Sequence, residues 1–97
     1  MQNYKKQYLF YLHMNKLKDY RKKIDFIDKK IAKLLSLRFN LAKQIASYKK
    51  KNKIKITDKK RELRVINNIK KYSNKKYQKF IIGIFKSIIN HSKKIQK

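Results

Sequence analysis

Apolar residues recur at alternating steps of three and four along the first half of the chain. They fall at Leu17, Tyr20, Ile24, Ile27, Ile31, Leu34, Leu41, Ile45 and Tyr48. This heptad pattern predicts one continuous helix over about residues 16–51, and a single polar residue, Arg38, interrupts its apolar stripe. At 1.5 Å per residue such a helix is roughly 50 Å long. A chain of 97 residues cannot cover a stripe of that length by itself, so the pattern predicts a partner chain.

Two shorter helices follow the long one. Residues 52–57 lack helical periodicity and are predicted to form a loop, after which Asp58 is a suitable N-cap for a helix over 58–72. Ser73 and Asn74 interrupt the pattern, and a third helix is predicted over 75–96, in which Gly83 is expected to mark a close helix crossing. The inward positions are Val65, Ile66, Ile69 and Tyr72 in the second helix, and Tyr77, Phe80, Ile81, Ile84, Phe85, Ile88 and Ile89 in the third. The predicted fold is all-α, with three helices per chain and two chains intertwined as a homodimer through the long first helix.

The segment 1–15 is predicted to be an extension that precedes one domain over 16–97. Its apolar run, residues 8–12, follows Lys5 and Lys6 and faintly resembles a signal peptide. The run is too short for a membrane span and lacks a small-residue cleavage site, so an extra helical turn or a frayed extension is expected, in a cytoplasmic protein. The chain contains no Cys, which excludes disulfides and thiolate metal sites.

A net charge of +25 dominates the composition and allows a nucleic-acid or anionic-membrane partner. Two details favour a solvated lysine surface instead. Only four of the thirty basic residues are Arg, the residue whose fork suits phosphates and bases. The lysines also run along the whole chain rather than forming one block, so nucleic-acid binding is kept as an alternative.

Cations along the first helix are the first candidates for chemistry. Arg38 lies in the apolar stripe, where a desolvated guanidinium requires an anionic partner. Lys49 follows roughly 16 Å along the helix and about 20° around it, so the two could bracket a small dianion; alternatively, Lys49 is one more surface lysine. Arg21 is roughly 42 Å from Lys49 along the same helix and could share a site with it only across an antiparallel dimer.

Polar residues in the other two helices are the second set of candidates. Glu62, near Arg61, is either a simple first-turn acid or an acceptor for a substrate hydroxyl. Ser92 and Gln96 share one face that continues the inward line of the third helix, which suggests a polar pocket or an exposed helix end. His13 and His91 are isolated, and no phosphate loop or Ser-His-Asp set is found.

Three motifs together resemble the all-helical, AroQ-type chorismate mutases. The first is YRKKIDFID at 20–28. It is continued by LLSLR at 34–38, by Leu41-Ala42 and by Tyr48-Lys49. The second is DKKRE at 58–62, and the third is IINHSKKIQ at 88–96. Each motif is weak alone, but all three occur in order with the expected loop lengths over residues 16–96.

The resemblance implies a role for each candidate. Arg38, Lys49, Ser92 and the partner subunit's Arg21 would hold the two carboxylates of chorismate. Lys49 and Gln96 would donate to the ether oxygen of the breaking bond, which makes them, with Arg38, the catalytic residues. Glu62 and the backbone of Asp58 would bind the ring hydroxyl, beside Arg61.

The implied reaction is the [3,3] rearrangement of chorismate to prephenate, in phenylalanine and tyrosine biosynthesis. It requires no cofactor, metal or nucleophile, only a flexible dianion held in its reactive conformer and donors aimed at the ether oxygen. Three alternatives stay open: an isochorismate-pyruvate lyase on the same fold, a basic helical nucleic-acid-binding protein, and a dimerisation module without catalysis. Asp58 and Glu62, suited to the chorismate hydroxyl, favour the mutase over the lyase.

Overall fold

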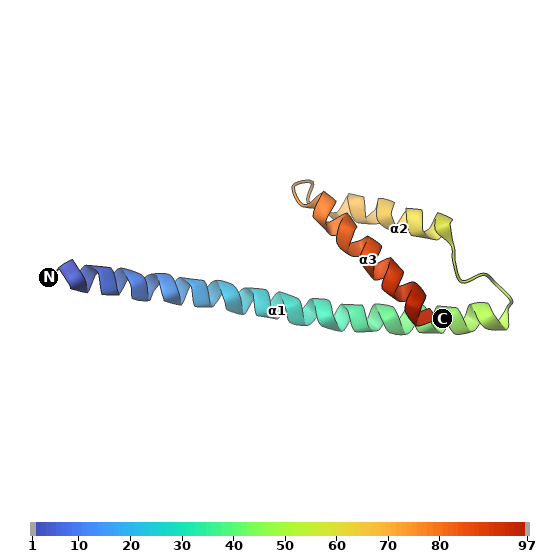
Figure 1. Ribbon diagram of the computed structural model, residues 1–97, viewed down its shortest axis with the longest axis horizontal. Helices are drawn as coiled ribbons and strands as arrows, with labels where there is room; N and C mark the ends of the chain where they lie inside the picture. The colour runs from blue at the N-terminus through green and yellow to red at the C-terminus, as the bar shows by residue number, and fades with distance from the viewer. Residues whose placement is uncertain (1, 97) are drawn as a thin grey trace. The chain divides into compact units, whose positions relative to one another are not determined.

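The computed structural model describes residues 2–96, which form three helices and no strand (Figure 1). Helix α1 spans Gln2–Lys51, α2 spans Lys59–Tyr72 and α3 spans Gln78–Gln96. The prediction of an all-α chain with a long first helix is therefore confirmed. The chain divides into two units, one ending at Ser36 and the other beginning at Leu37.

The first unit consists of α1 alone. The helix begins at Gln2, so the predicted start near residue 16 is wrong. Residues 2–15 include neither Gly nor Pro, and therefore no residue in this segment stops the helix from continuing toward the N-terminus. The boundary between an extension and a domain at residue 15 stays a prediction that rests on the resemblance. Within residues 2–96, no helix is long and apolar enough to cross a membrane.

The apolar stripe of this first unit is uncovered in the single chain. Tyr20, Ile24, Ile27 and Ile31 are each between 49% and 55% exposed. Large apolar side chains that repeat on one helix face normally lie against another element.

The end of α1 is a Schellman motif, which turns the chain toward the second helix. The amide of Ile54 donates to the carbonyl of Lys49 at 2.8 Å, and that of Lys53 donates to Lys50 at 3.4 Å. Lys53 has a φ of 54°, in the left-handed region that this motif requires and that a glycine adopts more readily. The predicted loop therefore begins with a defined reversal rather than with irregular chain.

Asp58 caps α2, as predicted. Its Oδ1 accepts a hydrogen bond from the amide of Arg61 at 3.0 Å, which satisfies one of the free amides in the first helical turn. At the other end, the Oγ and the amide of Ser73 both donate to the carbonyl of Ile69. Asn74 then accepts hydrogen bonds from the amides of Lys76 and Tyr77. This turn delays the start of α3 to Gln78, three residues beyond the prediction.

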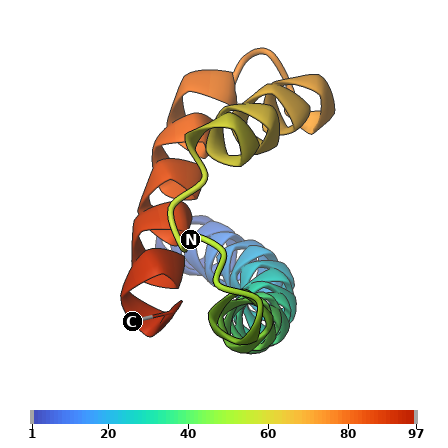
Figure 2. The ribbon, with the colours of Figure 1, turned by 90° about the vertical axis from the view of Figure 1, so that its right-hand side faces the viewer.

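In the second unit, α2 and α3 pack against each other, and the C-terminal end of α3 meets α1 (Figure 2). Ala42, Ile88 and Ser92 are the buried residues among those described, so the apolar core of one chain is small. The prediction that Gly83 marks a close helix crossing is wrong for the single chain. Gly83 is exposed, and a Cβ atom there would meet nothing within 4 Å.

Candidate active site

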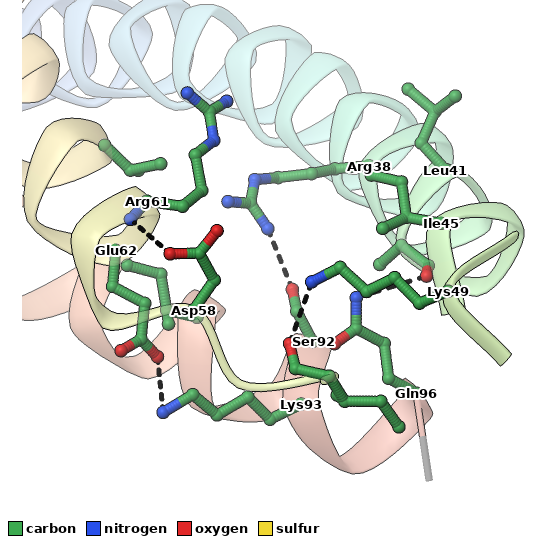
Figure 3. A pocket seen from close by; sticks show the side chains of 14 residues that line it. Arg38, Leu41, Ile45, Lys49, Asp58, Arg61, Glu62, Ser92, Lys93 and Gln96 are labelled. Carbon is green, nitrogen blue, oxygen red and sulfur yellow. Dashed lines mark hydrogen bonds and ion pairs between the residues drawn. The ribbon is translucent and has the colours of Figure 1, made fainter. Parts of the chain in front are cut away.

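A pocket of about 290 Å³ lies within the second unit, between the last turns of α1, the start of α2 and the end of α3 (Figure 3). It is lined by Arg38, Leu41, Ala42, Ile45, Lys49, Ile56, Asp58, Arg61, Glu62, Val65, Ile89, Ser92, Lys93 and Gln96. The aliphatic side chains form one part of the wall, and charged or amide groups converge from the other parts. This combination of an apolar wall with a few directed polar groups is typical of a small-molecule site.

Arg38 extends from α1 into this pocket, although it interrupts an otherwise apolar stripe. Its Nη1 donates to Ser92 Oγ at 2.8 Å, and Ser92 Oγ in turn donates to the carbonyl of Ile88 at 2.9 Å. Burial lowers the pKa of Arg38 from its ordinary value, and the positive charge of Arg61 lowers it further. No ion pair among residues 2–96 joins Arg38 to a carboxylate. The pocket thus holds a partly desolvated cation whose protein partner is neutral, an arrangement that an anionic ligand would stabilise.

Lys49 of α1 and Gln96 of α3 supply two further donors. Lys49 Nζ donates to the carbonyl of Ile56 in the loop, at 2.9 Å. Gln96 Nε2 donates to the carbonyl of Ala42 in α1, at 3.3 Å. Both donors therefore rest on backbone oxygens of the pocket wall, and a ligand oxygen could replace either partner.

The start of α2 contributes the acidic side of the pocket. Capping fixes Asp58 and the first turn, and this turn carries Arg61 and Glu62 toward the pocket (Figure 3). Glu62 forms an ion pair with Lys93 of α3 through its Oε1 atom. This oxygen is buried, and none of the described residues donates to it with hydrogen-bond geometry, so the contact is an ion pair rather than a directed hydrogen bond.

Most of the site residues expected from sequence line this one pocket. They are Arg38, Lys49, Asp58, Arg61, Glu62, Ser92 and Gln96. Arg21 does not line it and belongs to the first unit, on the exposed surface of α1.

Sequence reasoning missed Lys93 and the carbonyl of Ile56. One lysine among 26 does not stand out as a site residue in the sequence. A backbone carbonyl occurs at every residue, so residue type cannot indicate which one lines a site. The position of Lys93, directly after Ser92 on an inward-facing turn, was the one available indication.

Metal ligation has no obvious place in the described part of the chain. No group of three or more His, Asp or Glu side chains there is arranged to hold a metal ion. The pocket instead combines cations, an amide and a hydroxyl, which can bind an anion and stabilise negative charge that develops on an oxygen.

Comparisons with known proteins agree with this arrangement. The model of the family "Chorismate mutase type II" matches residues 20–97. A curated relative, the chorismate mutase of Methanocaldococcus jannaschii, is 41% identical over 86 residues, covering 87% of this chain and 87% of the relative. No solved structure shows significant similarity to the chain. The chain belongs to the chorismate mutase type II family.

Proposed function

We propose that this pocket binds chorismate and catalyses its [3,3] rearrangement to prephenate, as a step of phenylalanine and tyrosine biosynthesis. The observation that carries the proposal is the convergence of Arg38, Lys49 and Gln96 on one small pocket, with Glu62 on its far side. The substrate is a dianion with an ether oxygen and a ring hydroxyl, and the pocket offers a complementary group for each.

Two cations would hold the carboxylates of chorismate. Arg38, supported by Ser92, is partly desolvated and has no carboxylate partner among the described residues, so binding a carboxylate would offset the unfavourable burial of its charge. Lys49 lies on the same helix and would exchange the carbonyl of Ile56 for substrate. Holding both ends of a flexible molecule in its compact conformer removes much of the entropic part of the barrier.

Stabilisation of the ether oxygen would supply the rest of the catalysis. Negative charge develops on this oxygen as its bond to carbon breaks, and the Lys49 ammonium and the Gln96 amide would donate to it. Neither group transfers a proton in a pericyclic rearrangement. Glu62 would accept a hydrogen bond from the ring hydroxyl, which orients the ring against the apolar wall.

A second copy of the chain would complete the site. The uncovered stripe of α1 requires a partner, and a second α1 running antiparallel would cover it with an identical stripe. In such a dimer, Arg21 of each chain would reach the pocket of the other and add a cation for the substrate carboxylates. The expected assembly is therefore a homodimer with two shared sites.

The test follows chorismate loss by ultraviolet absorbance with the full chain and identifies the product. We expect prephenate, with activity reduced by about 10²–10³ in both Arg38→Ala and Gln96→Ala, the typical loss of one such donor. Lys50→Ala is the matched control, since its exposed side chain does not line the pocket. Release of pyruvate from isochorismate instead would identify a lyase. Inactivity of a folded dimer on chorismate would overturn the proposal.

A further inference from the structure

Lys93 is a charged pocket residue to which the proposed reaction assigns no role. It follows Ser92 in α3, it lines the pocket, and its side chain is 34% exposed. Its ammonium is paired with Oε1 of Glu62, the group expected to accept the hydroxyl of the substrate. The pair joins α2 to α3 at the edge of the pocket (Figure 3).

We propose that Lys93 is a positioning residue for Glu62, which fixes this carboxylate for the ring hydroxyl and compensates its charge beside a dianionic substrate. This inference rests on the proposed function and adds to it a residue that acts through Glu62 rather than on chorismate.

The geometry gives the first reason. A carboxylate has two oxygens, and a contact to one of them restrains rotation of the whole group. Oε1 is buried against Lys93 and is turned to no other donor in the described residues. With this oxygen held, the second oxygen can accept from a hydroxyl in the pocket at a smaller entropic cost, because the side chain is already ordered.

The charges give the second reason. Glu62 contributes a negative charge to a pocket that must accept two further negative charges, and like charges at short range are unfavourable. Arg38 and Lys49 are expected to pair with the carboxylates of the substrate rather than with the carboxylate of Glu62. Lys93 offsets the carboxylate of Glu62, so that the acceptor for the hydroxyl does not repel the ligand.

The position of Lys93 in α3 gives the third reason. Ser92 accepts from Arg38 of α1, and the next residue pairs with Glu62 of α2. One turn of α3 therefore supports both the cationic and the acidic sides of the pocket. A change in this turn would alter the two sides together.

A double-mutant cycle in kcat/KM tests the inference, with Glu62→Gln, Lys93→Met and the combined variant. We expect Lys93→Met to lose roughly 10-fold to 100-fold in the wild-type background, the range for leaving a buried acceptor without its partner. In the Glu62→Gln background the same change should have less than about a twofold effect, because Lys93 acts through Glu62. Lys93→Arg should restore most of the activity, which a merely structural requirement for lysine would not predict.

Lys94→Met is the matched control, since it removes the same charge from an exposed neighbour that does not line this pocket. An equal loss in that variant would attribute the effect to general charge and overturn the inference. A loss from Lys93→Met that persists with Gln at residue 62 would show direct contact with substrate and would also overturn it. If Lys93→Met retains full activity, the inference fails while the proposed function stands. If the wild-type protein does not convert chorismate, both fail.

Discussion

Both halves of the long helix carry an exposed apolar stripe in the single chain, but only the second half also lines the pocket. Before Ser36 the stripe is uncovered, and Tyr20, Ile24, Ile27 and Ile31 are each about half exposed. After Leu37 the apolar residues Leu41, Ile45 and Tyr48 are still 49–64% exposed, yet Ser92 and Gln96 of α3 form hydrogen bonds with Arg38 and with the carbonyl of Ala42. The difference shows that one chain supplies most of a pocket but lacks the cover for its own longest element.

The largest effect is expected from the uncovered stripe. The double variant Ile24→Gln and Ile31→Gln should dissociate the proposed dimer and lower kcat/KM by about 10³-fold or more, because interface anchors are worth about 2 kcal/mol each and the site also loses Arg21. Sedimentation and chorismate turnover measure the two consequences. Lys22→Gln with Lys29→Gln, on the polar side of the same helix, should remain dimeric and active. A monomer with full activity would contradict the shared site.

Arg38 allows substrate binding and fold stability to be tested separately in the half of α1 that lines the pocket. Arg38→Met should lower kcat/KM by about 10²–10³, while thermal unfolding should change by no more than about 4 °C. The lowered pKa means that folding disfavours the charged form, so at every pH below that pKa the charge opposes folding. Its loss therefore offsets the lost hydrogen bond to Ser92. A large fall in the unfolding temperature would show that Arg38 holds the fold together.

Mixing two impaired variants tests whether Arg21 of one subunit and Arg38 of the other belong to the same active site. Arg21→Ala and Arg38→Met should each be impaired alone. After equal mixing and exchange of chains, half of the dimers are mixed and each carries one intact site, so about a quarter of the wild-type activity should return. Combining both changes in one chain and mixing it with Arg38→Met is the control, which should stay inactive. Failure of the first mixture to recover would place Arg21 outside the site.

The smallest expected effect concerns Gly83, in an exposed part of α3. Gly83→Ala should stabilise the protein by about 0.5–1 kcal/mol, because alanine favours the helix and its Cβ meets nothing in the single chain. Thermal unfolding at several protein concentrations measures this. A loss of stability that is seen at concentrations where the chain is dimeric, and that diminishes on dilution, would show that the second copy approaches α3 closely at this position.

The local features of the molecule could be read from the sequence because they depend on neighbouring residues. The heptad pattern predicted the long helix, and Asp58 and the Ser73-Asn74 pair predicted where α2 begins and ends. The early start of α1 was missed because an absence of helix breakers is weaker information than a cap. The late start of α3 was missed because the hydrogen bonds of Asn74 hold Lys76 and Tyr77 in a turn.

For the candidate site, the residues could be predicted from the sequence, whereas their contacts could not. Residue types and their order indicated the family motifs, and with them seven of the pocket residues, without any coordinates. Only the folded chain decided that Lys49 rests on the carbonyl of Ile56, that Gln96 reaches Ala42, and that Lys93 pairs with Glu62. Gln96–Ala42 and Lys93–Glu62 join residues far apart in the chain, where periodicity carries no information, and their partners are set by how α3 packs against α2 and α1.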